Sequence, residues 1–153
     1  AIGYDTSLRR ALYKSLQSSG MTIANYGTIF VSIADADKPR ALPLIRRFYE
    51  LGFNIEATGG TATFLRENGI RTRMLKKLSE GSTEIFESIR KGHVNYVINT
   101  IDINQHSARL DGYDIRRCAV ENNVTIFTAL ETVSVLLDVL EEITLGVSTI
   151  DAE

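Results

Sequence analysis

The sequence has few of the residues that several common functions require. Its 153 residues include one cysteine, Cys118, so no disulfide can form within the chain, and we expect a reducing, cytoplasmic location. Cys118 lies in an apolar-periodic run, which predicts a buried thiol rather than a nucleophile. The two histidines, His93 and His106, give no zinc-site spacing with that cysteine. We expect neither a membrane span nor a signal peptide, because the sequence has no apolar run of about 18 residues and no charged-then-apolar leader.

An excess of charge of one sign is also missing. Seventeen basic and nineteen acidic residues give a formal net charge of −2, so we expect neither nucleic acid nor a membrane surface as a partner. A local basic site for an acidic ligand is compatible with this balance. The sequence does have 44% apolar and 24% charged residues, the ordinary composition of a globular domain with one core.

Segments typical of strands alternate with segments typical of helices. This alternation predicts a parallel sheet covered on both faces, here a Rossmann-like three-layer α/β sandwich with five strands. Before the last helix, Thr128 and Glu131 have the spacing of a capping box. The expected strands lie at about 28–33, 52–55, 71–75, 94–99 and 124–127, and the expected helices at about 6–18, 38–51, 62–68, 83–91, 111–122 and 129–145.

The stretch 57–62 (ATGGTA), between an expected strand and an expected helix, carries two adjacent glycines. Gly59 and Gly60 have no Cβ atom, so their backbone can take a positive φ and approach a ligand closely. The first turn of the following helix offers unpaired N–H groups at the positive end of the helix dipole, which attract phosphate. The stretch therefore predicts a phosphate-binding turn. The alternative is an ordinary strand-to-helix turn with Thr61 as the helix cap.

Other polar residues follow the expected strands at the same edge of the sheet. Ligands of doubly wound sheets bind beyond the carboxyl ends of the strands, where these residues would meet. Their convergence favours the phosphate-binding interpretation over the ordinary turn. The residues are Ser32 and Lys38 after the first expected strand, Thr58 and Thr61 after the second, Lys77 after the third, Asn99 and Thr100 after the fourth, and Thr128 after the fifth.

Catalytic residue sets are missing from these strand ends. No pair of carboxylates, no serine–histidine–acid set and no cysteine–histidine set falls there. Asp102 is the only nearby acid that could act as a base, and an isolated loop aspartate is more often a turn former. The sequence therefore predicts a site that holds a phosphate without transforming it.

Five stretches form one joint pattern: 32–38 (SIADADK), 57–62 (ATGGTA), 77–81 (KLSEG), 97–100 (VINT) and 115–117 (IRR). Together they resemble the methylglyoxal-synthase-like domain. More narrowly, the segment from about Tyr26 to Leu140 is similar to the C-terminal regulatory domain of the large chain of glutamine-dependent carbamoyl phosphate synthetase. The segment 3–20 resembles the end of the ATP-grasp domain that precedes this domain in that chain, which implies that the 153 residues are a fragment.

The resemblance implies a nucleotide-sensing domain with no catalysis, metal or cofactor of its own. Residues 1–20 would end the ATP-grasp domain or form a linker helix, residues 21–146 would form the regulatory domain, and residues 147–153 would form a tail. In many members of the family, uridine monophosphate regulates the synthesis of carbamoyl phosphate, a precursor of pyrimidines and arginine. The implied partners are a nucleotide effector, the ATP-grasp domains of the parent chain with ATP and Mg²⁺ or Mn²⁺, and a small glutaminase subunit.

The resemblance also assigns roles to the residues at the strand ends. Methylglyoxal synthase resembles this chain in the glycine turn, but its aspartate-bearing catalytic stretches have no match here. A small phospho-lyase of that type, acting on a triose phosphate, is the enzymatic alternative, and a structural or dimerising domain is a third. The residues implied to contact the effector phosphate are Ser32, Lys38, Thr58, Gly59, Gly60, Thr61 and Lys77, and those implied to contact the nucleoside are Asn99 and Thr100.

Overall fold

The computed structural model describes residues 27–76, 82–100 and 106–145, with the backbone alone described at 106–112 and 145. The expected helix at 6–18 and the expected tail therefore lie outside the described residues. The described elements, in chain order, are β1 (Thr28–Ser32), the 3-10 helix η1 (Asp35–Asp37), α2 (Lys38–Glu50), β2 (Asn54–Thr58), α3 (Gly59–Glu67), β3 (Thr72–Leu75), α4 (Glu84–Arg90), β4 (Tyr96–Asn99), α5 (His106–Glu121), β5 (Thr125–Phe127) and α6 (Leu130–Leu145).

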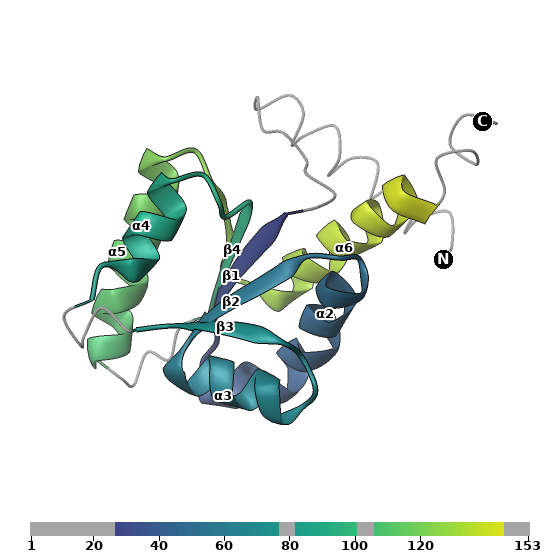
Figure 1. The fold of residues 1–153 in the computed structure, drawn as a ribbon, viewed down its shortest axis with the longest axis horizontal. Helices are drawn as coiled ribbons and strands as arrows, with labels where there is room; N and C mark the ends of the chain where they lie inside the picture. Colours follow the sequence, from purple (N-terminus) through teal and green to yellow (C-terminus); the bar gives the residue numbers. More distant parts are fainter. Residues whose placement is uncertain (1–26, 77–81, 101–105, 146–153) are drawn as a thin grey trace.

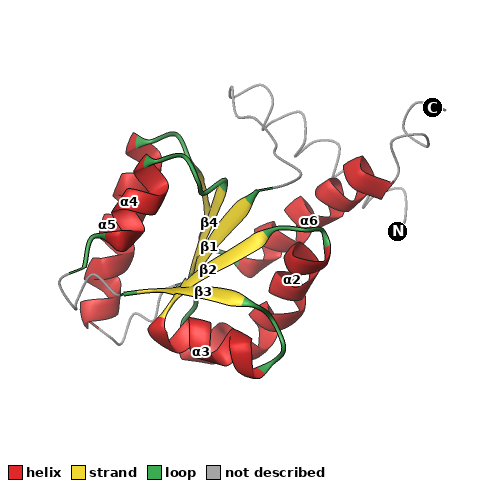
Figure 2. Ribbon diagram, viewed as in Figure 1, coloured by secondary structure: helices red, strands yellow, loops and turns green. Residues whose placement is uncertain are grey.

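The five strands form one parallel sheet in the order β3-β2-β1-β4-β5. From β1 the chain moves outward through β2 to β3, then crosses to the other side of β1 for β4 and β5. Helices α2, α3 and α6 cover one face, and α4 and α5 cover the other, as right-handed connections require (Figures 1 and 2). This arrangement confirms the predicted three-layer α/β sandwich.

The apolar core lies on both faces of the central strand. Ile29, Phe30 and Val31 of β1 are all fully buried, because a parallel strand between two helical layers has no solvent-exposed face. Ile29 and Val31 belong to the cluster beneath α2, α3 and α6, whereas Phe30 belongs to the cluster beneath α4 and α5. The alternation of side chains along β1 thus joins both layers of the core.

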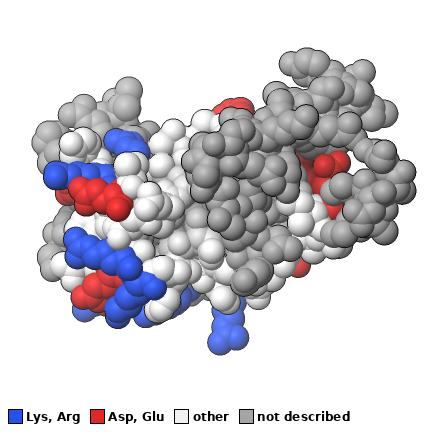
Figure 3. All heavy atoms as spheres, turned by 90° about the horizontal axis from the view of Figure 1, so that it is seen from above, with Lys and Arg blue, Asp and Glu red and all other residues white. Residues whose placement is uncertain are grey.

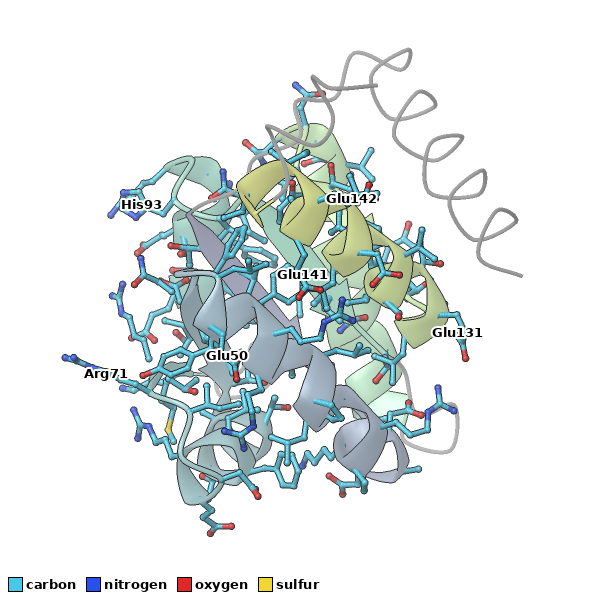
Figure 4. The ribbon with its side chains drawn as sticks, turned by 90° about the vertical axis from the view of Figure 1, so that its right-hand side faces the viewer. Glu50, Arg71, His93, Glu131, Glu141 and Glu142 are labelled. Atoms are coloured by element: carbon cyan, nitrogen blue, oxygen red, sulfur yellow. The ribbon has the colours of Figure 1, made fainter. Side chains whose placement is uncertain are left out.

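Ion pairs join α2 to α6 on the outer side of the larger layer. Arg47 contacts both Asp138, at 2.7 Å, and Glu141, which is labelled on α6 in Figure 4. Partial burial opposes the charge of Arg47, but the hydrogen bonds to Glu141 and Asp138 raise the pKa of its guanidinium above the ordinary value. The guanidinium cation of α2 is therefore held by two carboxylates of α6.

The start of α6 differs from the prediction. Ala129, not Thr128, precedes the first helical residue, and the Thr128 side chain is exposed. Glu131 pairs with Arg40 of α2 at 3.4 Å instead of reaching back to cap its own helix. The predicted capping box is therefore wrong, because a partner distant in sequence binds the carboxylate.

Two other helices begin earlier than predicted. Helix α5 begins at His106, although a polar loop was expected up to residue 110. Helix α3 begins at Gly59, so Gly59 and Gly60 lie in its first turn. Neither glycine has a positive φ; the glycines that do are Gly27, Gly52, Gly69 and Gly92 among the described residues. The expected left-handed conformation of the glycine turn is thus not the reason for its two glycines.

A buried carboxylate anchors α4 to the sheet. Glu56 of β2 accepts a hydrogen bond from the Ser88 hydroxyl of α4 at 2.6 Å, and Arg73 of β3 lies 3.3 Å from its other oxygen. A buried charge that is hydrogen-bonded and paired is compatible with a stable core. We therefore assign Glu56 to the architecture and not to the site described next.

Candidate functional site

The site predicted from the sequence lies at one edge of the sheet. Val31 pairs with Ala57 in register, and Ser32 pairs with Asn99, so the carboxyl ends of β2, β1 and β4 are level. Helix α2 follows β1 on one face, whereas α5 follows its neighbour β4 on the other. Such a divergence of neighbouring connections is where open parallel sheets bind ligands.

The N-terminus of α3 is free to accept an anion at this edge. Thr58, the N-cap residue, has extended backbone angles, but its side chain makes no capping hydrogen bond. The first-turn N–H groups, which include those of Gly59 and Gly60, therefore have no cap from Thr58. They lie at the positive end of the helix dipole, which is the arrangement that binds phosphate.

Lys38 brings a cation to the same helix turn. Its Nζ lies 3.3 Å from the position that a Cβ atom on Gly60 would occupy. The Lys38 side chain is only 16% exposed, and its Nζ is 2.5 Å from the Asp35 carboxylate, which is itself 79% exposed. Gly60 thus leaves room for a partly buried ammonium group beside the first turn of α3.

Gly60→Ala tests this close approach. The added methyl group would crowd Nζ and displace Lys38, so the affinity for a phosphorylated ligand should fall about 3- to 10-fold if part of one charged hydrogen bond is lost. Stability should stay level or rise by up to about 1 kcal/mol, because alanine favours the helix more than glycine does. Calorimetric titration and thermal unfolding of the same sample measure both. An affinity that remains unchanged would show that Lys38 does not need this space.

The Thr61 hydroxyl is engaged by the protein itself. Thr61 is 4% exposed, and its Oγ1 accepts a hydrogen bond from the Ile33 N–H at 3.1 Å. Its hydroxyl also lies 3.5 Å from the Ile33 carbonyl oxygen. Thr61 is therefore not the helix cap of the alternative interpretation, and its predicted contact with a phosphate stays a prediction.

The end of β4 contributes one unsatisfied polar atom. Asn99 is 3% exposed, and its Oδ1 is buried with no hydrogen-bond partner among the described residues. The next residue, Thr100, accepts a hydrogen bond from the Ala34 N–H at 2.8 Å and donates its own N–H to the Ser32 carbonyl oxygen at 3.1 Å. A buried acceptor without a donor is rare and costly, so Asn99 fits a site that a ligand donor completes.

The other chemically reactive residues named in the sequence analysis lie away from this site or outside the described residues. Lys77 and Asp102 lie outside the described residues. His93 precedes β4 and so lies at the opposite, amino edge of the sheet. Cys118 lies on the buried side of α5, where burial raises the pKa of its thiol, which agrees with the prediction of a buried thiol.

Asp35 is an acid that the sequence did not assign to the site. Asp102 was expected to be the only nearby acid that could act as a base, and that expectation stays a prediction; Asp35 also lies at this edge, 2.5 Å from Lys38 Nζ, but it is 79% exposed. The signal was available in the sequence, because Asp35 and Lys38 are three residues apart at the start of an expected helix. A carboxylate and an ammonium group therefore meet at the edge where the phosphate was predicted.

Three features of the described residues concern charged partners, metal ions and membranes. In the face drawn in Figure 3, basic and acidic side chains lie next to each other rather than in one large patch of a single sign. Within 27–76, 82–100 and 106–145, no group of three or more His, Cys, Asp or Glu residues is arranged to hold a metal ion. Among the helices of the described segments, none combines the length and apolar character needed to cross a membrane.

Comparison with known proteins agrees with this fold. Residues 40–128, more than half of the chain, match the family model of the MGS-like domain. The chain therefore belongs to the MGS-like domain family. A crystal structure of methylglyoxal synthase from Elizabethkingia anophelis NUHP1 superposes with a TM-score of 0.61 over 75% of this chain and 79% of that chain. The two sequences are 18% identical, so this similarity supports the shared fold.

Proposed function

We propose that this chain is a nucleotide-sensing regulatory domain that binds a nucleoside monophosphate, with uridine monophosphate as the first candidate. The enzyme it would regulate is glutamine-dependent carbamoyl phosphate synthetase. One observation carries the proposal: a lysine ammonium group lies beside the first turn of α3, which has no side-chain cap, and a buried amide oxygen with no partner among the described residues lies at the end of a strand of the same edge. The members of this arrangement are Lys38, the first turn of α3 and Asn99.

The α3 side of this edge suits a phosphate group. Lys38 supplies a charge-assisted hydrogen-bond donor, and the first turn of α3 supplies backbone N–H groups. The Thr58 hydroxyl, which does not cap the helix, is an additional donor at the end of β2. Lys77, which follows β3 in the sequence, remains a proposed fourth contact.

The β4 side suits the nucleoside. Asn99 Oδ1 has no hydrogen-bond donor within the described part of the chain, and ribose hydroxyls and base N–H groups could supply one. Ser32 and Thr100 border Asn99, and the Thr100 backbone is fixed by its bond to the Ser32 carbonyl oxygen. The proposed ligand thus carries a phosphate at one end and a hydroxyl or N–H donor at the other.

The proposed regulation is a coupling between two distant sites. The chemistry of the parent enzyme would lie in its ATP-grasp domains, with ATP, a divalent cation and the glutaminase subunit. An effector can act there only by binding one state of the whole enzyme better than another. Such coupling is typically about 1–3 kcal/mol, and it is reciprocal. If the effector weakens the binding of a substrate, that substrate must weaken the binding of the effector by the same factor.

A small phospho-lyase is the second candidate function. The structural similarity to methylglyoxal synthase and the position of Asp35 beside Lys38 favour it. A lyase of this kind would use a carboxylate to remove a proton from a triose phosphate. Asp35, however, is largely exposed and already paired with Lys38, which makes it a weak candidate for a base.

Titration with matched ligands tests the proposed function. Uridine monophosphate should bind at least about 10-fold more tightly than uridine, since a charged hydrogen bond to phosphate contributes roughly 1.5–3 kcal/mol. Isothermal titration calorimetry at one ionic strength gives both affinities. Equal affinities would contradict a phosphate-binding site. In parallel, methylglyoxal formation from dihydroxyacetone phosphate by the same sample would instead support the phospho-lyase.

A further inference from the structure

Lys38 already has an anionic partner within the protein. Its Nζ lies 2.5 Å from the carboxylate of Asp35, which comes three residues earlier in the chain. Asp35 begins the 3-10 helix η1, and Lys38 directly follows the last residue of that helix. The Lys38 N–H bonds to the Asp35 carbonyl oxygen, so the backbone of η1 keeps the two side chains within reach of each other. A carboxylate therefore occupies the ammonium group that is proposed to bind a phosphate.

The two partners of this ion pair differ in their exposure. The Lys38 side chain is only 16% exposed and lies beside Gly60 in the first turn of α3, whereas the Asp35 side chain is 79% exposed. The ammonium group thus has a place next to α3, while the carboxylate lies on the solvent side. An ion pair with an exposed partner contributes little to stability, so a ligand replaces it at small cost.

The carboxylate also changes the charge that a ligand meets at this edge. Lys38 and Asp35 together carry no formal net charge, whereas Lys38 alone is a cation. An ammonium group has three donors, and Asp35 accepts a hydrogen bond from one of them. A phosphate that approaches the first turn of α3 is therefore attracted by the helix N–H groups and by Lys38, but it is repelled by the carboxylate.

We propose that Asp35 limits the affinity of the site for phosphate, because its carboxylate occupies Lys38 until a ligand displaces it. The proposal rests on the proposed function and deepens it, since Lys38, Thr58 and Thr61 remain proposed phosphate contacts. The loss of affinity is the same for every ligand that carries a phosphate. Inorganic phosphate has no other contact to offset this loss, whereas a nucleotide gains the proposed contact to Asn99 Oδ1. Asp35 thus favours phosphorylated nucleosides over free phosphate as the ligands that fill the site.

Asp35→Asn tests this role, because it removes the charge with little change in shape. The variant should bind inorganic phosphate and uridine monophosphate each about 2- to 5-fold more tightly than wild-type protein does, the range of an exposed ion pair. Both gains should shrink as salt is added, because Asp35 is exposed. Isothermal titration calorimetry at two ionic strengths measures them. Unchanged or weaker binding of either ligand by Asp35→Asn would overturn the proposal.

Asp37→Asn is the matched control for charge in general. Asp37 belongs to the same 3-10 helix and directly precedes Lys38, but the ion pair of Lys38 in this helix is with Asp35. Removing the Asp37 charge should therefore change each affinity by less than about 1.5-fold. If Asp37→Asn and Asp35→Asn gain equally, the effect is general electrostatics, and the proposal is wrong.

Uridine separates the two ends of the ligand. It has no phosphate that could displace the Asp35 carboxylate, so uridine should bind wild-type protein and Asp35→Asn with the same affinity. The ratio of the affinities for uridine monophosphate and inorganic phosphate should also be the same in both proteins, since Asp35 acts on the phosphate that these ligands share. An equal gain for uridine would place Asp35 on the nucleoside side and would contradict the proposal.

The outcomes distinguish this inference from the proposed function. If uridine monophosphate binds wild-type protein no more tightly than uridine does, the proposed function fails. Inorganic phosphate then still decides the role of Asp35: a gain in Asp35→Asn supports it, and no phosphate binding by that variant overturns it. If uridine monophosphate binds at least about 10-fold more tightly than uridine but Asp35→Asn brings no gain, the inference fails and the proposed function stands.

Thermal unfolding confirms that each variant is folded before its affinity is used. If Asp35→Asn does not fold, Asp35→Ala supplies the same measurements, because it removes the same carboxylate.

Discussion

Lys38→Ala should weaken the binding of uridine monophosphate about 10- to 150-fold, the largest loss of affinity that we expect from one substitution. The estimate takes roughly 1.5–3 kcal/mol for a charge-assisted hydrogen bond and 1.4 kcal/mol for each factor of ten. The fold should survive, because the ion pair with the exposed Asp35 contributes at most about 1 kcal/mol. Titration calorimetry and thermal unfolding measure the two quantities.

A matched control distinguishes the lysine from charge in general. Lys91, an exposed residue at the end of α4, lies at the opposite edge of the sheet. Lys91→Ala removes the same charge, so it should leave the affinity unchanged beyond a small salt-dependent effect. If Lys38→Ala and Lys91→Ala weaken binding equally, the attraction is general, and Lys38 is not a phosphate ligand.

Gly27→Ala should have the largest effect on stability. Gly27 has a φ of +126°, and a Cβ atom there would lie 1.8 Å from Asn95 Oδ1. That same Oδ1 accepts the Thr28 N–H at the start of β1, so moving Asn95 away leaves the strand's first N–H without its partner. Strain of about 1–3 kcal/mol and an unsatisfied group of about 1–3 kcal/mol predict a loss of roughly 2–6 kcal/mol in the free energy of unfolding. Chemical denaturation measures it.

Gly52→Ala separates the clash from the backbone conformation. Gly52 also has a positive φ, +101°, but nothing lies within 4 Å of its Cβ position. In this variant the free energy of unfolding should therefore fall only by the cost of the strained backbone, about 1–2 kcal/mol. In addition, Asn95→Ala should lower the free energy of unfolding less in the Gly27→Ala background than in wild-type protein. In that background the hydrogen bond of Asn95 to Thr28 is already lost, and the smaller side chain relieves the collision. Equal losses from both glycine variants would show that the Asn95 contact is not responsible.

Local sequence patterns were sufficient for most of the fold. Apolar, β-branched runs such as 28–33 correspond to observed strands, and the last expected helix is observed as α6. These features depend on residues close together in the chain, and the sequence displays them directly. The order of the strands, β3-β2-β1-β4-β5, is known from the structure alone, because the same alternation is compatible with several orders.

Helix starts were predicted less well, since they depend on partners elsewhere. Thr128 and Glu131 have the local spacing of a capping box, yet Glu131 pairs with Arg40, which is 91 residues away. At the start of α4, by contrast, the Ser82 hydroxyl accepts the Glu84 N–H at 3.2 Å, a contact between close neighbours in the sequence, although Thr83 is the residue that precedes the helix. A cap whose competing partner is remote cannot be read from spacing alone.

The sequence by itself determined that a glycine turn, a lysine and the ends of successive strands meet at one edge of a parallel sheet, because strand ends and helix starts are marked by short local patterns. Only the tertiary structure decided how these groups are used. Thr61 bonds to Ile33 across 28 residues, Thr100 bonds to Ala34 across 66, and Asn99 Oδ1 remains buried without a described partner. Each of these facts depends on side chains that the sheet order brings together. The sequence around a hydroxyl or amide group does not show which distant residue will be its hydrogen-bond partner.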